Sequence, residues 1–137
     1  MPTFIHGKAA VFKVADNGGT LRDISNVLNS SGLNRQVDAA ETTAFGASDK
    51  ASIAGLRGAS IPLGGLCDVT VDGYLAGILG HSTPVAWELY PQGSATTLPK
   101  YSGSAILTSY ETSTEVGDVV KVSGELQVTG AITRTVL

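Results

Sequence analysis

The last third of the chain holds its clearest pattern of hydrophobic and polar positions. Two long runs rich in β-branched residues, Lys100 to Glu111 and Val119 to Leu137, flank a short turn. Such runs joined by a turn predict a long terminal β-hairpin. The runs are mixed in polarity, and a strand with a polar face needs either water or another subunit on that face. We therefore expect this hairpin to take part in assembly.

The first third of the chain predicts shorter strands. Lys8 to Ala15 has the composition of a strand, and Asp16 to Gly19 (Asp-Asn-Gly-Gly) is a strong turn signal. Thr20 to Leu28 is expected to return as the second strand of this hairpin. A further strand is predicted from Leu33 to Ala44.

The segment from Phe45 to Leu66 has no sustained period of two or of 3.6 residues, and it is rich in Gly, Ala and Ser. Asp49 could cap one helical turn that reaches Ile53. A connection of this length inside a compact domain is usually functional or disordered. An ordered loop with few apolar anchors is most simply held by a neighbouring chain.

Beyond this segment the pattern becomes regular again. A strand is predicted from Leu66 to Val71, and a helix from Asp72, as its N-cap, to Leu79, with Gly80 as the residue that ends it. A strand from Val85 to Tyr90 carries the single tryptophan, Trp87. The predicted fold class is mainly β with one short helix, in a single domain comprising residues 1–137.

Composition narrows the possible functions. The 137 residues are 42% hydrophobic and only 15% charged, and the formal net charge is −3. A sparsely charged surface is expected where much of it contacts other protein, because interface cores are depleted in charge. A sequence-independent nucleic-acid binder needs a basic footprint, so the net charge argues against one.

Candidate catalytic and metal-binding groups form no recognisable set. His6 and His81 have no Cys or His at metal-ligand spacing, and Cys67 is expected to be a small core thiol. Glu111 and Glu115 are more readily explained as a solvated acidic rim than as a catalytic pair. No nucleophile elbow, P-loop or dinucleotide fingerprint occurs. The sequence therefore predicts no enzyme, no metal site and no cofactor.

Targeting signals are equally weak. The N-terminus lacks a charged head followed by an apolar run, so no signal peptide is expected. No apolar stretch approaches the roughly 20 residues of a membrane helix. Synthesis and folding in a cytoplasm, without membrane insertion, are expected.

Three blocks of sequence occur in an order that is specific in combination, although each is weak alone. The first block comprises Pro2–Lys8, Leu21–Ser25 and Asp38–Gly46, the second Gly55–Ile61 running into Asp68, and the third Tyr101–Gly103 through Thr133-Arg134, with Gln127–Gly130 as its clearest part. With these blocks the chain resembles the tail tube protein, or major tail protein, of long non-contractile-tailed bacteriophages. Leu66-Cys67 departs from the family pattern, which has an aromatic before the Asp, and this departure concerns core packing.

The resemblance implies a β-sandwich-like tail tube fold with a helix on one side, whose long strands join a multi-subunit inner β-barrel. It implies homo-hexameric rings that stack helically into a hollow tube, which conducts genomic DNA into the host cell without binding it specifically. It also implies a virion location, synthesis in the host bacterial cytoplasm, and three partners: the tape-measure protein, the tail terminator and the distal tail protein.

The terminal hairpin and C-terminal strand, residues 100–137, would then line the barrel. The expected lumen-facing residues are Lys121, Ser123, Glu125, Gln127 and Thr129. The expected core residues are Val120, Val122, Leu126, Val128 and Trp87. A register slip of one residue would exchange the two faces. We expect a neutral or acidic lumen, because six copies at −3 each carry −18, and like charge keeps DNA from adhering.

The long loop, residues 42–60, is expected to make the inter-ring contact. Its candidate contact residues are Phe45, Asp49, Lys50, Ile53, Leu56 and Arg57. The alternative is an ordinary loop folded onto its own domain.

Two other functions remain open at this point. The tube of a contractile injection system shares the expected fold. A ligand-binding β-sandwich module would need a platform of exposed aromatic side chains, but aromatic residues make up only 6% of the chain and Trp87 lies in a core-like strand.

Overall fold

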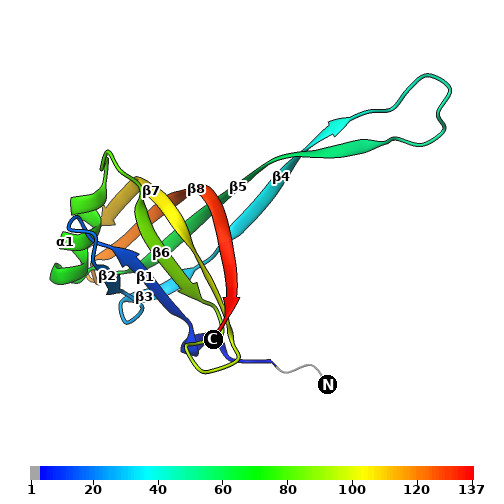
Figure 1. The fold of residues 1–137 in the computed structure, drawn as a ribbon. Coiled ribbons are helices and arrows are strands. Elements are labelled where there is room, and N and C mark those ends of the chain that lie inside the picture. Colours follow the sequence, from blue (N-terminus) through cyan, green and yellow to red (C-terminus); the bar gives the residue numbers. More distant parts are fainter. Residues whose placement is uncertain (1–3) are drawn as a thin grey trace.

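The computed structural model describes residues 4–137 as one curled, eight-stranded sheet that carries a helix at one end (Figure 1). All paired strands run antiparallel, in the order β2-β1-β6-β7-β8-β5-β3, and β4 pairs with β5 outside this path. The elements are a 3-10 turn η1 (Gly7–Ala9), β1 (Val11–Ala15), β2 (Leu21–Asp23), β3 (Leu28–Ser31), β4 (Asn34–Glu41), β5 (Ser52–Leu66), α1 (Val69–Ile78), β6 (Val85–Tyr90), β7 (Pro99–Ser113) and β8 (Lys121–Val136). The predicted class, mainly β with one helix, is confirmed.

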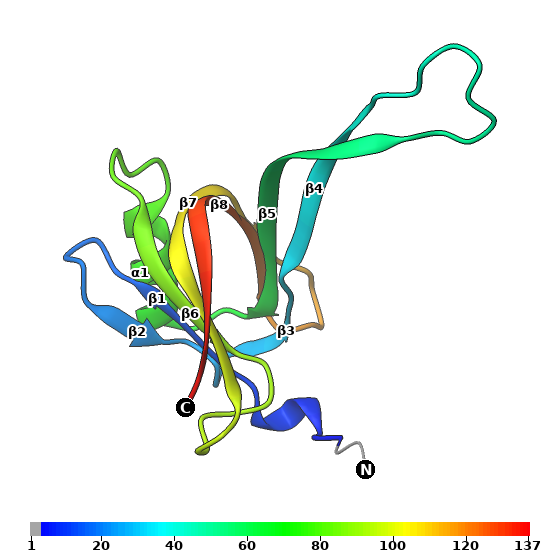
Figure 2. The same ribbon diagram turned by 45° about the vertical axis from the view of Figure 1, so that its right-hand side comes forward.

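The terminal hairpin, β7 with β8, forms the centre of the sheet and bends it. Its register shifts between Ser102 and Ser104 and again between Leu107 and Ser109. An extra residue in one strand bends that strand and increases its twist. The sheet therefore curls until its two halves face each other, giving the half-barrel shape visible in Figure 2.

The core fills the concave side of this curled sheet. The largest fully buried side chains are Trp87, Phe12, Ile24, Ile61, Ile78, Leu126 and Val14. They come from both halves of the sheet and from α1, so each element buries one face against the others. In β8 the side chains alternate between Val122 and Val128. Val122, Leu126 and Val128 are buried, Gly124 is half-buried, and the intervening residues are exposed.

Helix α1 begins one turn before the predicted start. Asp68 is its N-cap, and its carboxylate accepts hydrogen bonds from the backbone N–H groups of Thr70 (3.1 Å) and Val71 (3.3 Å). The predicted strand from Leu66 to Val71 is therefore wrong beyond Leu66, because this cap satisfies N–H groups that the first turn of a helix leaves without a partner. Gly80 follows the C-cap with φ 74°, as expected for the residue that ends the helix.

The expected irregular segment from Phe45 to Leu66 is the largest error of the sequence analysis. Residues 52–66 form one continuous 15-residue strand, β5, and no helical turn follows Asp49. Backbone pairing holds this strand along its whole length. Its first part is bonded to β4, and its second part lies between β3 and β8. Only residues 42–51 form the connecting loop.

Smaller differences concern the predicted return strand, Cys67 and the first residues of the chain. The predicted return strand from Thr20 to Leu28 is shorter, because Ile24 turns into the core and separates β2 from β3. The prediction that Cys67 is a core thiol is wrong, because this residue is exposed just after β5 ends. The sequence block Pro2–Lys8 is only partly visible here, since its first two residues lie outside the described range.

Gly73 offers a stabilising substitution within α1. A Cβ built on this residue has no heavy atom within 4 Å, and alanine favours a helix over glycine by about 1 kcal/mol. We expect Gly73→Ala to raise the free energy of unfolding by about 0.5–1 kcal/mol, measured by chemical denaturation. Gly80→Ala is the matched control, and it should destabilise the protein because residue 80 has a positive φ. A loss of stability in Gly73→Ala would show that this helix face is covered.

Two tyrosine hydroxyls make the stability of the fold depend on pH in the alkaline range. The Tyr110 hydroxyl donates to Asp72 Oδ1 (2.6 Å), and the Tyr90 hydroxyl donates to Glu88 Oε1 (2.7 Å). Burial, assisted by the hydrogen bond to Glu88, raises the pKa of Tyr90 to about 12. Burial and the bond to Asp72 likewise raise the pKa of Tyr110 above its ordinary value.

In the unfolded chain these tyrosines titrate near pH 10. Their full contribution to stability is therefore present below about pH 10, and it is lost as the pH rises toward the folded-state values, because the unfolded chain releases protons first. We expect the free energy of unfolding to fall between about pH 10 and pH 12. Denaturation curves of a Tyr90→Phe/Tyr110→Phe variant should show a smaller fall over the same range, and an unchanged fall would assign it to other groups.

Candidate assembly surfaces

The most unusual surface is a two-stranded arm that projects from the body of the protein (Figures 1 and 2). It consists of β4, the loop 42–51 and the first part of β5. Every residue of β4, and the first six residues of β5, are exposed. An isolated two-stranded ribbon is at best marginally stable in water. The arm therefore lacks, within residues 4–137, the packing that would hold it in one place.

The arm carries large apolar side chains that are exposed to solvent. Phe45 is completely exposed in the loop, Leu56 is 82% exposed, and Ile53 and Val37 are more than half exposed. Apolar groups gathered on a projection mark an interaction surface rather than scattered surface residues. All six residues predicted for inter-ring contact lie on this arm, although three of them, Ile53, Leu56 and Arg57, belong to β5 and not to a loop.

The root of the arm is the point where β5 and β8 separate. Their register ends at Ser60 and Gln127, and beyond it the two strands follow different partners. Gln127 Nε2 donates to the carbonyl oxygen of Ala59 (3.0 Å), which β8 no longer reaches through its backbone. A side chain thus satisfies the first β5 acceptor beyond the shared register.

The convex face of β8 carries the residues predicted to line a lumen. Lys121, Ser123, Glu125, Gln127 and Thr129 are all exposed on one side of the strand. One cation and one anion are among them, so their formal charges cancel. On the other side, Val122, Leu126 and Val128 are buried, as is Trp87 in β6.

The expectation of a core position for Val120 is wrong. Its side chain is 39% exposed, because the residue lies in the turn before β8 begins at Lys121. Side chains begin to alternate between core and solvent only from Lys121, where backbone pairing with β5 and β7 fixes the register of β8. The same turn exposes Val116 fully and Val119 by half, a feature that the sequence analysis missed. An apolar residue between acidic ones in a turn is the signal that could have revealed it.

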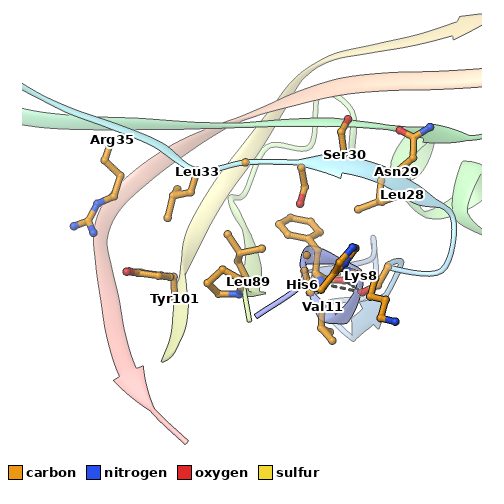
Figure 3. Close-up of a pocket in the computed structure, with 17 residues that line it drawn as sticks. His6, Lys8, Val11, Leu28, Asn29, Ser30, Leu33, Arg35, Leu89 and Tyr101 are labelled. Atoms are coloured by element: carbon orange, nitrogen blue, oxygen red, sulfur yellow. Dashed lines mark hydrogen bonds between the residues drawn. The ribbon is translucent and has the colours of Figure 1, made fainter. Parts of the chain in front are cut away.

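The concave side is open at the end where β3 meets β4 (Figure 3). A groove of about 940 Å³ lies there between η1 and β3, with Leu33 and Leu89 among its apolar walls. Arg35 and Tyr101 face each other at one end, with the guanidinium 5.8 Å from the ring centroid. The core is therefore uncovered at this end of the curled sheet.

Metal-ligating and exposed aromatic side chains form no cluster within residues 4–137. In the described range, residues 4–137, no group of three or more His, Cys, Asp or Glu side chains is arranged to hold a metal ion. No helix in this part of the chain is long and apolar enough to cross a membrane. The two most exposed large aromatic side chains, Phe4 and Phe45, lie on different elements, and Trp87 is fully buried.

Comparison with known proteins gives one family match. The family model described as phage tail tube protein matches residues 5–134, which is nearly the whole chain. Among curated proteins, none matches the sequence significantly.

Solved structures with the same fold come from several kinds of tail. The tail of an empty gene transfer agent (GTA) particle, refined with C6 symmetry, superposes with a TM-score of 0.82 at 16% identity, covering 96% of this chain and 99% of that one. The SPP1 tail tube gives 0.75 at 13% identity, covering 98% and 80%. The PVC sheath-tube complex, an extracellular contractile injection system, gives 0.72 at 15% identity, covering 100% and 95%.

Proposed function

Because the chain belongs to the phage tail tube protein family, we propose that six copies form a ring and that rings stack into a hollow tail tube through which genomic DNA passes. Closing a sheet through neighbouring subunits removes exposed strand edges. In the described part of the chain, β8 beyond Val128 and the first part of β5 each have only one partner strand. These edges are free to contact neighbouring copies in the assembled tube.

The projecting arm is the observation that carries this proposal. It exposes Phe45, Ile53 and Leu56 without packing them on its own domain, and burying such side chains contributes about 1.5–3 kcal/mol each. A subunit in an adjacent ring is the partner that the arm could reach. The polar residues Asp49, Lys50 and Arg57 would set the register of that contact.

The convex face of β8 is the proposed lumen wall. Its five outward side chains are polar with no net formal charge, and the whole subunit carries −3. A neutral or acidic wall does not retain a polyanion, so DNA would pass without specific binding. A structural role without catalysis, cofactor or metal follows from this proposal.

A tube of this kind needs partners at its ends and inside it. We infer a tape-measure protein in the lumen, a tail terminator at one end and a distal tail protein at the other. The subunit would be made in the bacterial cytoplasm and end in the virion tail, with residues 1–137 as a single tail tube domain.

Negative-stain electron microscopy of the purified protein at rising concentration tests the proposal. Hollow tubes or stacked rings are the expected result. Monomers at every concentration, both alone and after addition of a tail-tip complex as nucleus, would contradict it. A glycan screen would then test the ligand-binding module.

A second candidate, the tube of a contractile injection system, is favoured by the similarity to the PVC sheath-tube complex. Such a tube needs a sheath around it. Co-purification of a sheath protein with the tubes would support this candidate, and smooth tubes without a sheath would support the non-contractile tail.

A further inference from the structure

The separation of the arm from β8 creates a second cleft on the concave side, which we call the fork groove. It has a volume of about 380 Å³ and lies between the root of the arm and residues 128–132 of β8. Arg35, Val37 and Arg57 line it from the arm, and Val128 and Ile132 line it from β8. Its walls thus combine apolar side chains with two arginines.

Both arginines lack a carboxylate partner within residues 4–137. The ion pairs found there join Arg22 to Asp16, Lys100 to Glu88 and Lys121 to Asp118. In the register of β4 with β5, Arg35 lies opposite Ala59 and Val37 lies opposite Arg57, so the two guanidinium groups lie on one face of the arm. A planar guanidinium is suited to bind a carboxylate through two hydrogen bonds. The fork groove is therefore shaped for an apolar segment that carries acidic groups.

The turn between β7 and β8 is a segment of this kind. The β7–β8 turn, residues 114–120, contains Glu115 and Asp118, and Glu111 lies just before it. No lysine or arginine occurs between Lys100 and Lys121. Val116 is fully exposed, and Val119 is 56% exposed. Acidic and apolar groups are thus combined in one projecting turn.

The turn and the groove lie toward opposite ends of the long strands. Lys121 pairs with Leu66 at the end of β5 that is distant from the arm, whereas the groove lies beyond the pairing of Ser60 with Gln127. In Figure 2 the turn, drawn in orange, lies near β3 beside the lower end of β5, and the arm extends upward. A feature at one end that is complementary to a feature at the other makes a heterologous contact, which repeats from copy to copy in one direction.

We propose that the β7–β8 turn of one copy docks in the fork groove of a second copy in the next ring. Val116 enters between Val37 and Ile132, and Glu115, with Glu111, pairs with Arg35 and Arg57. Asp118 keeps its internal partner Lys121. This inference rests on the proposed stacking of rings, and it gives the stack a direction.

The arm loop is a less suitable occupant of the groove. Its residues 42–51 carry Asp49 next to Lys50, so the loop has no net charge to offer two arginines. The charge balance therefore favours the β7–β8 turn.

Charge reversal tests the pairing in the full-length protein. Arg35→Glu/Arg57→Glu and Glu111→Arg/Glu115→Arg should each raise the critical concentration for assembly at least about tenfold, because like charges then face each other. A chain with all four substitutions should assemble within about threefold of the original. Lys8→Glu, which changes the charge by −2 at one exposed position outside the fork groove, is the control and should have little effect.

Failure of the fourfold variant to recover, or normal assembly by both reversed pairs, would overturn the docking while leaving the tail tube function intact. A second test does not require tubes. With Cys67→Ser in place, Val37→Cys/Val116→Cys should form a ladder of disulfide-linked oligomers under mild oxidation. Val69→Cys/Val116→Cys, which places the first cysteine on an exposed position of α1, should not. Equal ladders from both variants would contradict the inference.

Discussion

A chain with serine in place of both Phe45 and Leu56 is expected to fold normally and to form no tubes. Neither side chain contributes to the core, since Phe45 is fully exposed and Leu56 is 82% exposed. The free energy of unfolding of the monomer should therefore change very little. If a neighbouring ring buries both side chains, the contact loses about 3–6 kcal/mol per subunit.

That loss is repeated at every subunit of a ring, so tube growth should stop rather than slow. Electron microscopy and sedimentation velocity measure assembly, and thermal unfolding followed by circular dichroism checks the fold. Val69→Ser is the matched control, because Val69 is 90% exposed but lies on α1, away from the arm. Tubes of normal length from the double variant would show that the arm makes no essential contact.

The second large effect is expected from a single methyl group at Gly65. A Cβ on this residue would lie 2.3 Å from the carbonyl oxygen of Val27 and 2.9 Å from the Cα of Leu28. Both atoms belong to the backbone, and the same carbonyl accepts a hydrogen bond from the N–H of Leu66 (2.9 Å). The clash can be relieved only by moving β3 away from β5.

We expect Gly65→Ala to lower the free energy of unfolding by about 3 kcal/mol, at the upper end of the usual cost of overpacking. For a domain of this size the melting temperature should fall by roughly 10 °C. Gly64→Ala provides a matched control one residue earlier. Its Cβ would meet Ser30 Oγ at 2.7 Å, and this hydroxyl can rotate away. If both variants unfold at the same temperature, the close backbone approach at Gly65 is not a constraint on the fold.

These two variants distinguish residues needed for assembly from a residue needed for folding. Phe45 and Leu56 belong to a surface that the monomer does not use, whereas Gly65 is needed for the monomer to close its sheet. The proposed tube requires both, since rings can stack only if β5 is held between β8 and β3 at one end and is free to form the arm at the other.

Parts of this fold could be predicted because the residues concerned are governed by local physics. The strand carrying Trp87 was predicted with its correct bounds, since alternating apolar residues between turn signals leave few alternatives. The terminal hairpin was predicted for the same reason, and with it the burial of Val122, Leu126 and Val128. The turn at Asp16–Gly19 and the helix end at Gly80 follow from residues that adopt positive φ or cap a turn.

Strand β5 depended on tertiary structure, because its conformation comes from its neighbours. Gly64 and Gly65 disfavour a strand when taken alone, yet they permit the close approach of β3. The start of α1 depended on tertiary structure as well, because either Asp68 or Asp72 could have capped it. Asp68 is the N-cap, and the carboxylate of Asp72 instead accepts a hydrogen bond from the Tyr110 hydroxyl.

The β-rich class, the hairpin at the end of the chain and the resemblance to tail tube proteins could all be inferred from the amino-acid sequence. Three features required the folded structure: residues 52–60 form half of a projecting arm, Val120 is exposed, and two arginines without a carboxylate partner within residues 4–137 share a groove. Local patterns fix which face of a strand is apolar. Which strands pair, and what they leave uncovered, depends on contacts between residues far apart in the chain.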